Sequence, residues 1–153
     1  MMKQNMDKNN LHIEYMKLAI NLAISDKNEV PVGALIIKNG VIIAESSNKK
    51  ELTKNPTAHA EMIVIQEACK KLDTSNLSDC SLYVTLEPCP MCASAILHSK
   101  ISNIYFGAYD NLYGAFGSAL DMRNYIKFNP TITGGILELE CRNIIKIFFK
   151  NLR

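Results

Sequence analysis

The chain has no tryptophan, and no uninterrupted apolar run in it approaches the roughly 20 residues that a membrane-spanning helix requires. Residues 1–10 are polar and lack the apolar core of a signal peptide, so the sequence predicts a cytoplasmic protein without a membrane partner. The net charge is only +2, and the pI of about 8.2 lies below the strongly basic range that by itself marks a nucleic-acid-binding protein. Composition therefore argues against a membrane protein and names no partner. We attribute the lack of tryptophan to genome base composition.

The length of the chain limits its domain organisation. Its 153 residues, 48% of them hydrophobic, can bury one substantial core but leave little room for a second. We find no internal repeat, linker or low-complexity segment. The sequence therefore predicts a single domain over residues 1–153, in which residues 1–10 are flexible.

Cysteine is scarce and unevenly placed. Of the five cysteines, Cys89 and Cys92 form a Cys-x-x-Cys pair, whereas Cys69, Cys80 and Cys141 are scattered. In a reducing compartment such a pair more often binds a metal or performs redox chemistry than forms a structural disulfide. The scattered three lack the spacing of metal ligands, and the apolar surroundings of Cys141 favour a small core residue.

Hydrophobic periodicity predicts an alternation of helices and strands. We expect helices over residues 11–27, 59–72, 90–98 and 137–152. We expect strands over residues 32–38, 41–45, 81–86 and 101–106, and a short edge strand at 131–133. Asn39-Gly40 favours a type I′ hairpin between the first two strands. Segments 46–56 and 107–130 are expected to be mostly irregular. The repeated strand, helix, strand order indicates an α/β fold with parallel strands and helices on both faces of the sheet.

His59, Cys89 and Cys92 have the residue types and spacing of a metal site. Cys89 and Cys92 stand at i and i+3 over an expected helix start, where both side chains lie on one side of the first turn. The positive end of the helix dipole favours thiolates there. His59 stands at a second helix start, and in a parallel sheet such starts meet at one crevice. Three protein ligands leave the fourth tetrahedral position of zinc open, which indicates catalysis rather than scaffolding.

Glu61 completes the chemistry without being a fourth ligand. Two residues after His59, it points about 200° away around a helix, given 3.6 residues per turn. At a helix start it can still reach a metal-bound water and pass protons to a substrate. A lone His-x-Glu is common by chance. His-x-Glu followed by Pro-Cys-x-x-Cys, however, matches the zinc-deaminase signature.

With these two motifs the chain resembles the bacterial tRNA-specific adenosine deaminases of the cytidine-deaminase-like superfamily. The resemblance extends over nearly the whole chain and includes residues 29–34, Asn48, and residues 56–61, 82–89, 106–108, 117–118 and 148–149. It implies a three-layer α/β/α fold, with a central mixed sheet of about five strands and helices on both faces. It also implies one zinc ion per subunit and a homodimer.

The resemblance also implies an activity and roles for individual residues. The activity is hydrolytic deamination of adenosine to inosine at the wobble position of a tRNA anticodon, with release of ammonia. His59, Cys89 and Cys92 hold zinc, zinc hydroxide attacks C6, and Glu61 is the proton shuttle. The substrate partner is the tRNA anticodon stem-loop, whose bases can be unstacked at low cost. Asn48, Asp110 and Phe149 are the implied substrate-binding residues.

Several alternatives stay open. A basic stripe of Arg142, Lys146 and Lys150 can meet phosphates or can be the solvated face of a packed helix. The loop aromatics Tyr109 and Tyr113 can stack on bases or pack in the core.

Two positions depart from the family pattern. Leu112-Tyr113 stands where many members carry Lys and a small residue, and Asn55 stands where Asp is common. The main rival function is a free nucleobase or nucleoside deaminase of guanine or cytosine type with the same zinc chemistry. A non-catalytic zinc or RNA-binding module is a further rival, but binding alone does not need Glu61.

Overall fold

The computed structural model describes residues 2–152, with side chains from residue 7 onward. Within this part of the chain the elements are α1 (Met2–Ala23), β1 (Gly33–Lys38), β2 (Val41–Ser47), α2 (Lys50–Thr53), α3 (Ala60–Leu72), β3 (Cys80–Leu86), α4 (Pro90–His98), β4 (Asn103–Ala108), a 3-10 turn (Met122–Asn124), β5 (Thr131–Thr133) and α5 (Glu138–Asn151). None of these helices is long and apolar enough to cross a membrane.

The strands form one mixed sheet in the order β2-β1-β3-β4-β5. Strand β1 is antiparallel to both of its neighbours, β2 and β3, whereas β3, β4 and β5 are parallel. Strands β2, β3, β4 and β5 therefore all point the same way, and β1 alone is reversed. Asn39 and Gly40, between β1 and β2, have the positive φ angles of 51° and 75° that a type I′ turn requires. The predicted mixed sheet of about five strands is confirmed.

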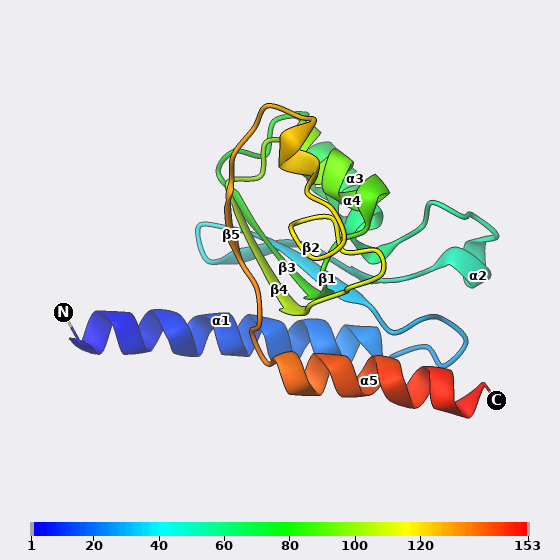
Figure 1. Cartoon of the computed structure of the whole chain (residues 1–153). Coiled ribbons are helices and arrows are strands. Elements are labelled where there is room, and N and C mark those ends of the chain that lie inside the picture. Colours follow the sequence, from blue (N-terminus) through cyan, green and yellow to red (C-terminus); the bar gives the residue numbers. More distant parts are fainter. Residues whose placement is uncertain (1, 153) are drawn as a thin grey trace.

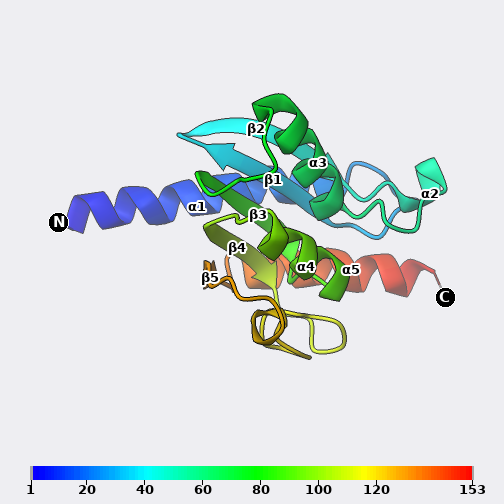
Figure 2. The same cartoon turned by 90° about the horizontal axis from the view of Figure 1, so that it is seen from above.

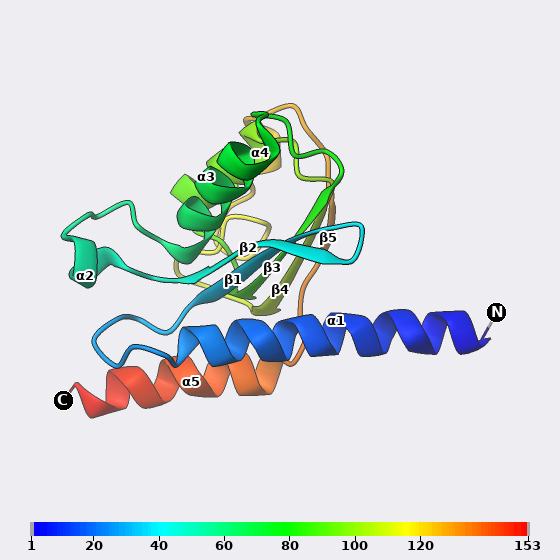
Figure 3. The same cartoon turned by 180° about the vertical axis from the view of Figure 1, so that it is seen from behind.

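Helices cover both faces of the sheet, which confirms the predicted three layers (Figures 1 and 2). Side chains alternate along β1, so Ile36 faces the helices α3 and α4, whereas Leu35 and Ile37 face α1 and α5. Helix α1 lies so close to the sheet that a Cβ on Gly33 would be 1.9 Å from the carbonyl oxygen of Ala19. Figure 3 shows this layer from behind, with α1 and α5 under the strands.

The boundaries of α1 differ from the predicted residues 11–27. The helix begins at Met2 because residues 2–10 contain no Gly or Pro and several good helix formers, although they lack amphipathic spacing. It ends at Ala23, after which the Ser25 hydroxyl donates to the carbonyl of Leu22 and Asp26 accepts from the amide of Asn28. The flexibility of residues 1–10 stays a prediction.

Two further segments differ from the prediction in detail. Strand β4 runs from Asn103 to Ala108 rather than over 101–106, because the ladder with β3 continues to the pair of Leu86 and Ala108. The segments predicted as mostly irregular contain α2 and the 3-10 turn.

The sheet topology places three loops at the same end of the sheet. Strands β2, β3 and β4 point the same way, so the residues that follow them, Asn48, Glu87 and Tyr109, emerge at the same end of the sheet. The segments that lead to α3 and α4 start there as well. Carboxyl ends of parallel strands are where ligand sites form in open α/β sheets.

Candidate active site

Two helix starts bring the three predicted metal ligands together. His59 is the N-cap of α3 and Cys89 is the N-cap of α4, both with extended backbone, and Pro90 then begins α4. Cys92 lies in the first turn of α4. The Nδ1 atom of His59 is 3.7 Å from the Sγ of Cys89 and 3.5 Å from the Sγ of Cys92. All three ligand atoms lie within 4.8 Å of one another, so they can share one metal ion.

The two thiols of the cluster differ in pKa, and one of them is readily ionised. Hydrogen bonding to Cys92, together with that to His59, lowers the pKa of Cys89 to about 4. The interaction with Cys89 raises the pKa of His59 and, together with burial, raises the pKa of Cys92. One thiolate therefore forms readily, and a second forms when a cation lies between the sulfurs. Two sulfurs and one imidazole nitrogen with an open fourth position fit zinc.

Asn48 fixes the start of α3 relative to the sheet. Its Oδ1 accepts from the amide of Ala60 at 2.8 Å, and its Nδ2 donates to the carbonyl of Val30 at 3.0 Å. Ala60 directly follows His59, so Asn48 helps to hold that ligand in place. Asn48 also lines the same pocket as His59.

Glu61 lies outside the group of three ligands and on the wall of the same pocket as His59 and Cys89. Its side chain is only 4% exposed. Burial raises the pKa of Glu61 above its ordinary value. A carboxyl group with a raised pKa beside a metal site is suited to exchange protons with a substrate.

A pocket of about 940 Å³ opens beside the cluster and is lined by all three predicted substrate-binding residues, Asn48, Asp110 and Phe149. Large apolar side chains stand exposed in its lining, with Leu112 at 80%, Tyr113 at 66% and Phe149 at 48%. Neighbouring exposed apolar groups in the lining of a pocket indicate a binding surface.

Of the basic stripe on α5, Arg142 lines this pocket and pairs with Glu138. Lys146 and Lys150 are exposed outside the pocket lining. Tyr109 and Tyr113 both line the pocket and are exposed, and Tyr109 also packs edge to face on Phe106 at 5.0 Å between ring centroids.

Two buried carboxyl groups at the pocket were not assigned a role from the sequence. Glu29 accepts from the amide of Leu52 at 2.8 Å and so holds α2 against the pocket. Glu87, which directly follows β3, accepts four hydrogen bonds from the loop after β4. The sequence held one sign of the role of Glu87: it is an acidic residue directly after the mostly apolar residues 82–86, where a side chain is expected to be buried, and a buried carboxyl group needs hydrogen-bond partners.

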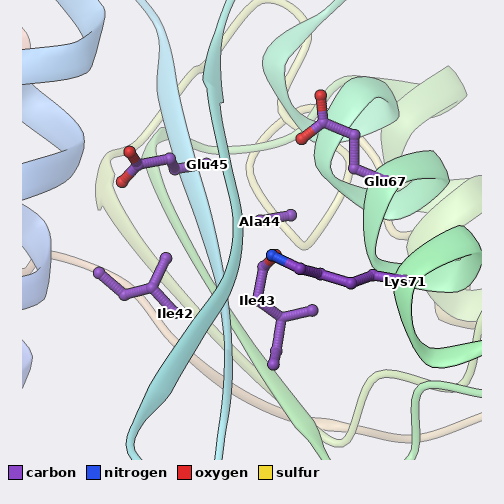
Figure 4. Close-up of a pocket in the computed structure, with 6 residues that line it drawn as sticks. All are labelled: Ile42, Ile43, Ala44, Glu45, Glu67 and Lys71. Atoms are coloured by element: carbon purple, nitrogen blue, oxygen red, sulfur yellow. The ribbon is translucent and has the colours of Figure 1, made fainter.

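A second hollow, of about 380 Å³, lies between β2 and α3 (Figure 4). The Nζ of Lys71 donates there to the carbonyl of Ile43 at 3.1 Å. Neither the metal-ligand group nor Glu61 contributes to this hollow.

Comparisons with known proteins agree with this geometry. Residues 9–108, which include the three ligands and Glu61, match the cytidine and deoxycytidylate deaminase zinc-binding region. The tRNA-specific adenosine deaminase of Bacillus subtilis (strain 168) is 45% identical over 143 residues, which cover 91% of this chain and 89% of that protein.

Two solved structures are informative. One, from a study of A-to-I editing by tRNA:A34 deaminases at the wobble position of transfer RNA, has a TM-score of 0.80 and 38% identity, covering 86% of this chain and 98% of that chain. The guanine deaminase of Bacillus subtilis has a TM-score of 0.62 and 42% identity, covering 64% of each chain.

Proposed function

Because this chain belongs to the tRNA-specific adenosine deaminases, within the cytidine and deoxycytidylate deaminase family, we propose that it deaminates the wobble adenosine of a tRNA anticodon by hydrolysis. The products are inosine and ammonia. The observation that carries this proposal is the placement of a His, Cys, Cys cluster and a buried Glu61 on one large pocket with exposed apolar groups in its lining.

His59, Cys89 and Cys92 would hold one zinc ion per subunit, and a bound zinc ion supplies a water of lowered pKa. Glu61 takes the two protons of the attacking water in turn and delivers one to the ring nitrogen N1 and one to the departing 6-amino group. Each proton that the water loses is thus returned to the purine or to the ammonia that leaves. The low exposure of Glu61 keeps bulk solvent from competing for these protons.

Asn48, Asp110 and Phe149 would position the substrate. Asn48 lines the pocket, and its second amide hydrogen would contact the bound nucleoside. Asp110, which lines the pocket, would lie beside the RNA, and Phe149 would offer its exposed ring to a base.

The lining of the pocket favours RNA over a free base. A single purine fills only part of about 940 Å³, and small-molecule sites enclose most of their ligand's surface. Exposed Tyr113 and Phe149 instead suit the neighbouring bases of an anticodon loop. The likeness to a guanine deaminase makes deamination of a free base the second candidate.

One assay separates the two candidates. Zinc-loaded protein is incubated with an anticodon stem-loop carrying adenosine at the wobble position, and separately with free guanine, cytosine, cytidine and adenine. We expect inosine and ammonia from the stem-loop only. Activity confined to a free base would replace this proposal with the second candidate.

The proposal also covers assembly and location. We propose a homodimer in the cytoplasm, with residues 1–153 as one domain, on the strength of the family resemblance. Sedimentation equilibrium should give twice the subunit mass of 17.1 kDa.

A further inference from the structure

Glu87 is a buried carboxyl group at the pocket that the proposed chemistry does not use. It is 2% exposed and directly follows β3, two residues before Cys89. Its Oε1 accepts from the amide of Asp110 at 3.2 Å and from the hydroxyl of Ser118 at 2.5 Å. Its Oε2 accepts from the amides of Phe116 at 3.1 Å and Ser118 at 3.2 Å. Both oxygens of Glu87 are therefore engaged by the loop after β4.

The loop after β4 is folded around this one group. The amide of Ala115 also donates to the carbonyl of Pro88 at 2.8 Å. A Cβ on Gly114 would lie 2.5 Å from the Cδ of Glu87 and 2.6 Å from its Oε2, so only glycine lets the backbone approach this closely. Residues 110–118 thus wrap a single buried carboxyl group.

The same loop supplies one wall of the pocket, through Asp110, Leu112 and Tyr113. Leu112 and Tyr113 are mostly exposed, so side-chain packing does little to fix their positions. Their amides donate to Oδ1 of Asp110 at 3.0 and 3.1 Å, and the amide of Asp110 in turn donates to Glu87. The anchor of this wall is therefore Glu87.

We propose that Glu87 is a positioning residue that preorganises loop 110–118 as a fixed wall for the substrate. The identity of that substrate rests on the proposed function. An ordered wall spares binding the entropic cost of ordering the loop, so Glu87 contributes to affinity for the RNA rather than to the chemical step.

Glu87→Gln is the sharpest test because it keeps the size of the side chain. One carboxyl oxygen becomes an NH2 group, which faces at least one backbone N–H of the loop and removes its acceptor. We expect the KM for the stem-loop to rise roughly tenfold, as for the loss of one hydrogen bond to a charged group, and kcat to stay within about twofold. Zinc content should stay at about one per subunit.

Hydrogen exchange measures the order of the loop directly and does not depend on an activity assay. In zinc-loaded Glu87→Gln, amides of Asp110, Phe116 and Ser118 should exchange roughly tenfold faster, whereas those of α3 and α4 keep their protection. Glu67→Gln is the matched control. It makes the same substitution on exposed Glu67, which lies at the hollow between β2 and α3 (Figure 4), and should change none of these quantities.

Each outcome decides the proposal. A raised KM together with faster loop exchange supports it, whereas unchanged exchange, lost zinc or a fall in kcat alone overturns it. If Glu87→Gln does not fold, Ser118→Ala removes only the hydroxyl donor, and its KM should rise about threefold; an unchanged KM overturns the proposal. If the wild type acts only on a free base, the proposed function fails, and the exchange measurement still decides the role of Glu87.

Discussion

Replacing Glu61 with glutamine should slow turnover strongly while leaving the predicted metal site intact. Glutamine keeps the size of the buried side chain but can neither take up nor release a proton. His59, Cys89 and Cys92 form their group without Glu61, so zinc content should stay at about one per subunit. The perturbation thus separates proton transfer from metal binding.

The expected loss of rate depends on whether another carboxyl group of the pocket can take over proton transfer from Glu61. Glu29 and Glu87 are both buried and accept hydrogen bonds from backbone amides, and Asp110 accepts from two amides of its own turn. Glu51 is exposed on α2. None of the four replaces Glu61, so the full contribution of a positioned acid or base, roughly 10²- to 10⁴-fold, should be lost. This corresponds to about 3–5 kcal/mol in the activation free energy.

The assay is the single-turnover rate of inosine formation in a stem-loop at saturating protein, with zinc measured on the same sample. Glu67→Gln, six residues further along α3 and exposed, is the matched control and should react at the wild-type rate. A Glu61→Gln protein that retains zinc and reacts within tenfold of wild type would refute the assignment of Glu61 as the proton shuttle.

Three further predictions concern the rest of the structure. Tyr113→Ala should raise the KM for the stem-loop roughly 5- to 150-fold if the ring stacks on a base, whereas Tyr113→Phe stays near wild type; equal effects of both, measured by initial rates, would contradict stacking. Cys92→Ala should lose zinc and activity in metal analysis, and Cys69→Ala should keep both. Burial, aided by the charge of Lys8, lowers the pKa of His12, whose Nδ1 lies 2.5 Å from the Tyr83 hydroxyl. Because the folded state favours neutral His12, its contribution to stability is fully present above the unfolded pKa of about 6.5 and is lost as pH falls from there through the lower pKa of the folded state. Thermal melts should therefore show a smaller drop in Tm from pH 7.5 to 5.5 for His12→Leu than for wild type, and identical drops would contradict this linkage.

The cluster of His59, Cys89 and Cys92 was predictable because its residues stand in short, recognisable sequence motifs. His59, Cys89 and Cys92 lie at helix starts, and caps and proline mark such starts in a sequence. The alternation of apolar runs likewise identified the strands of the sheet. Parallel strand ends then place the two helix starts together, so local patterns and one topological rule suffice for the site.

The walls of the pocket were not predictable in the same way. Glu87 binds backbone amides 23 to 31 residues further along the chain, and a backbone amide leaves no trace in the sequence. Glu29 binds the amide of Leu52 in the same manner. The start of α1 was missed because the polar residues 2–10 are held by helix propensity, without the amphipathic pattern on which the prediction relied.

The residues proposed for catalysis and the loop proposed to bind the substrate therefore have different structural supports in this fold. The predicted metal ligands and Glu61 are held by the starts of α3 and α4, which are packed into the core through Val64 and Ile96. The exposed wall is instead held by hydrogen bonds to buried Glu87. We therefore expect substitutions in the loop to change substrate binding without displacing the predicted metal ligands. A core shared with a guanine deaminase is compatible with a different substrate for this reason, and the loop after β4 is where the two are expected to diverge.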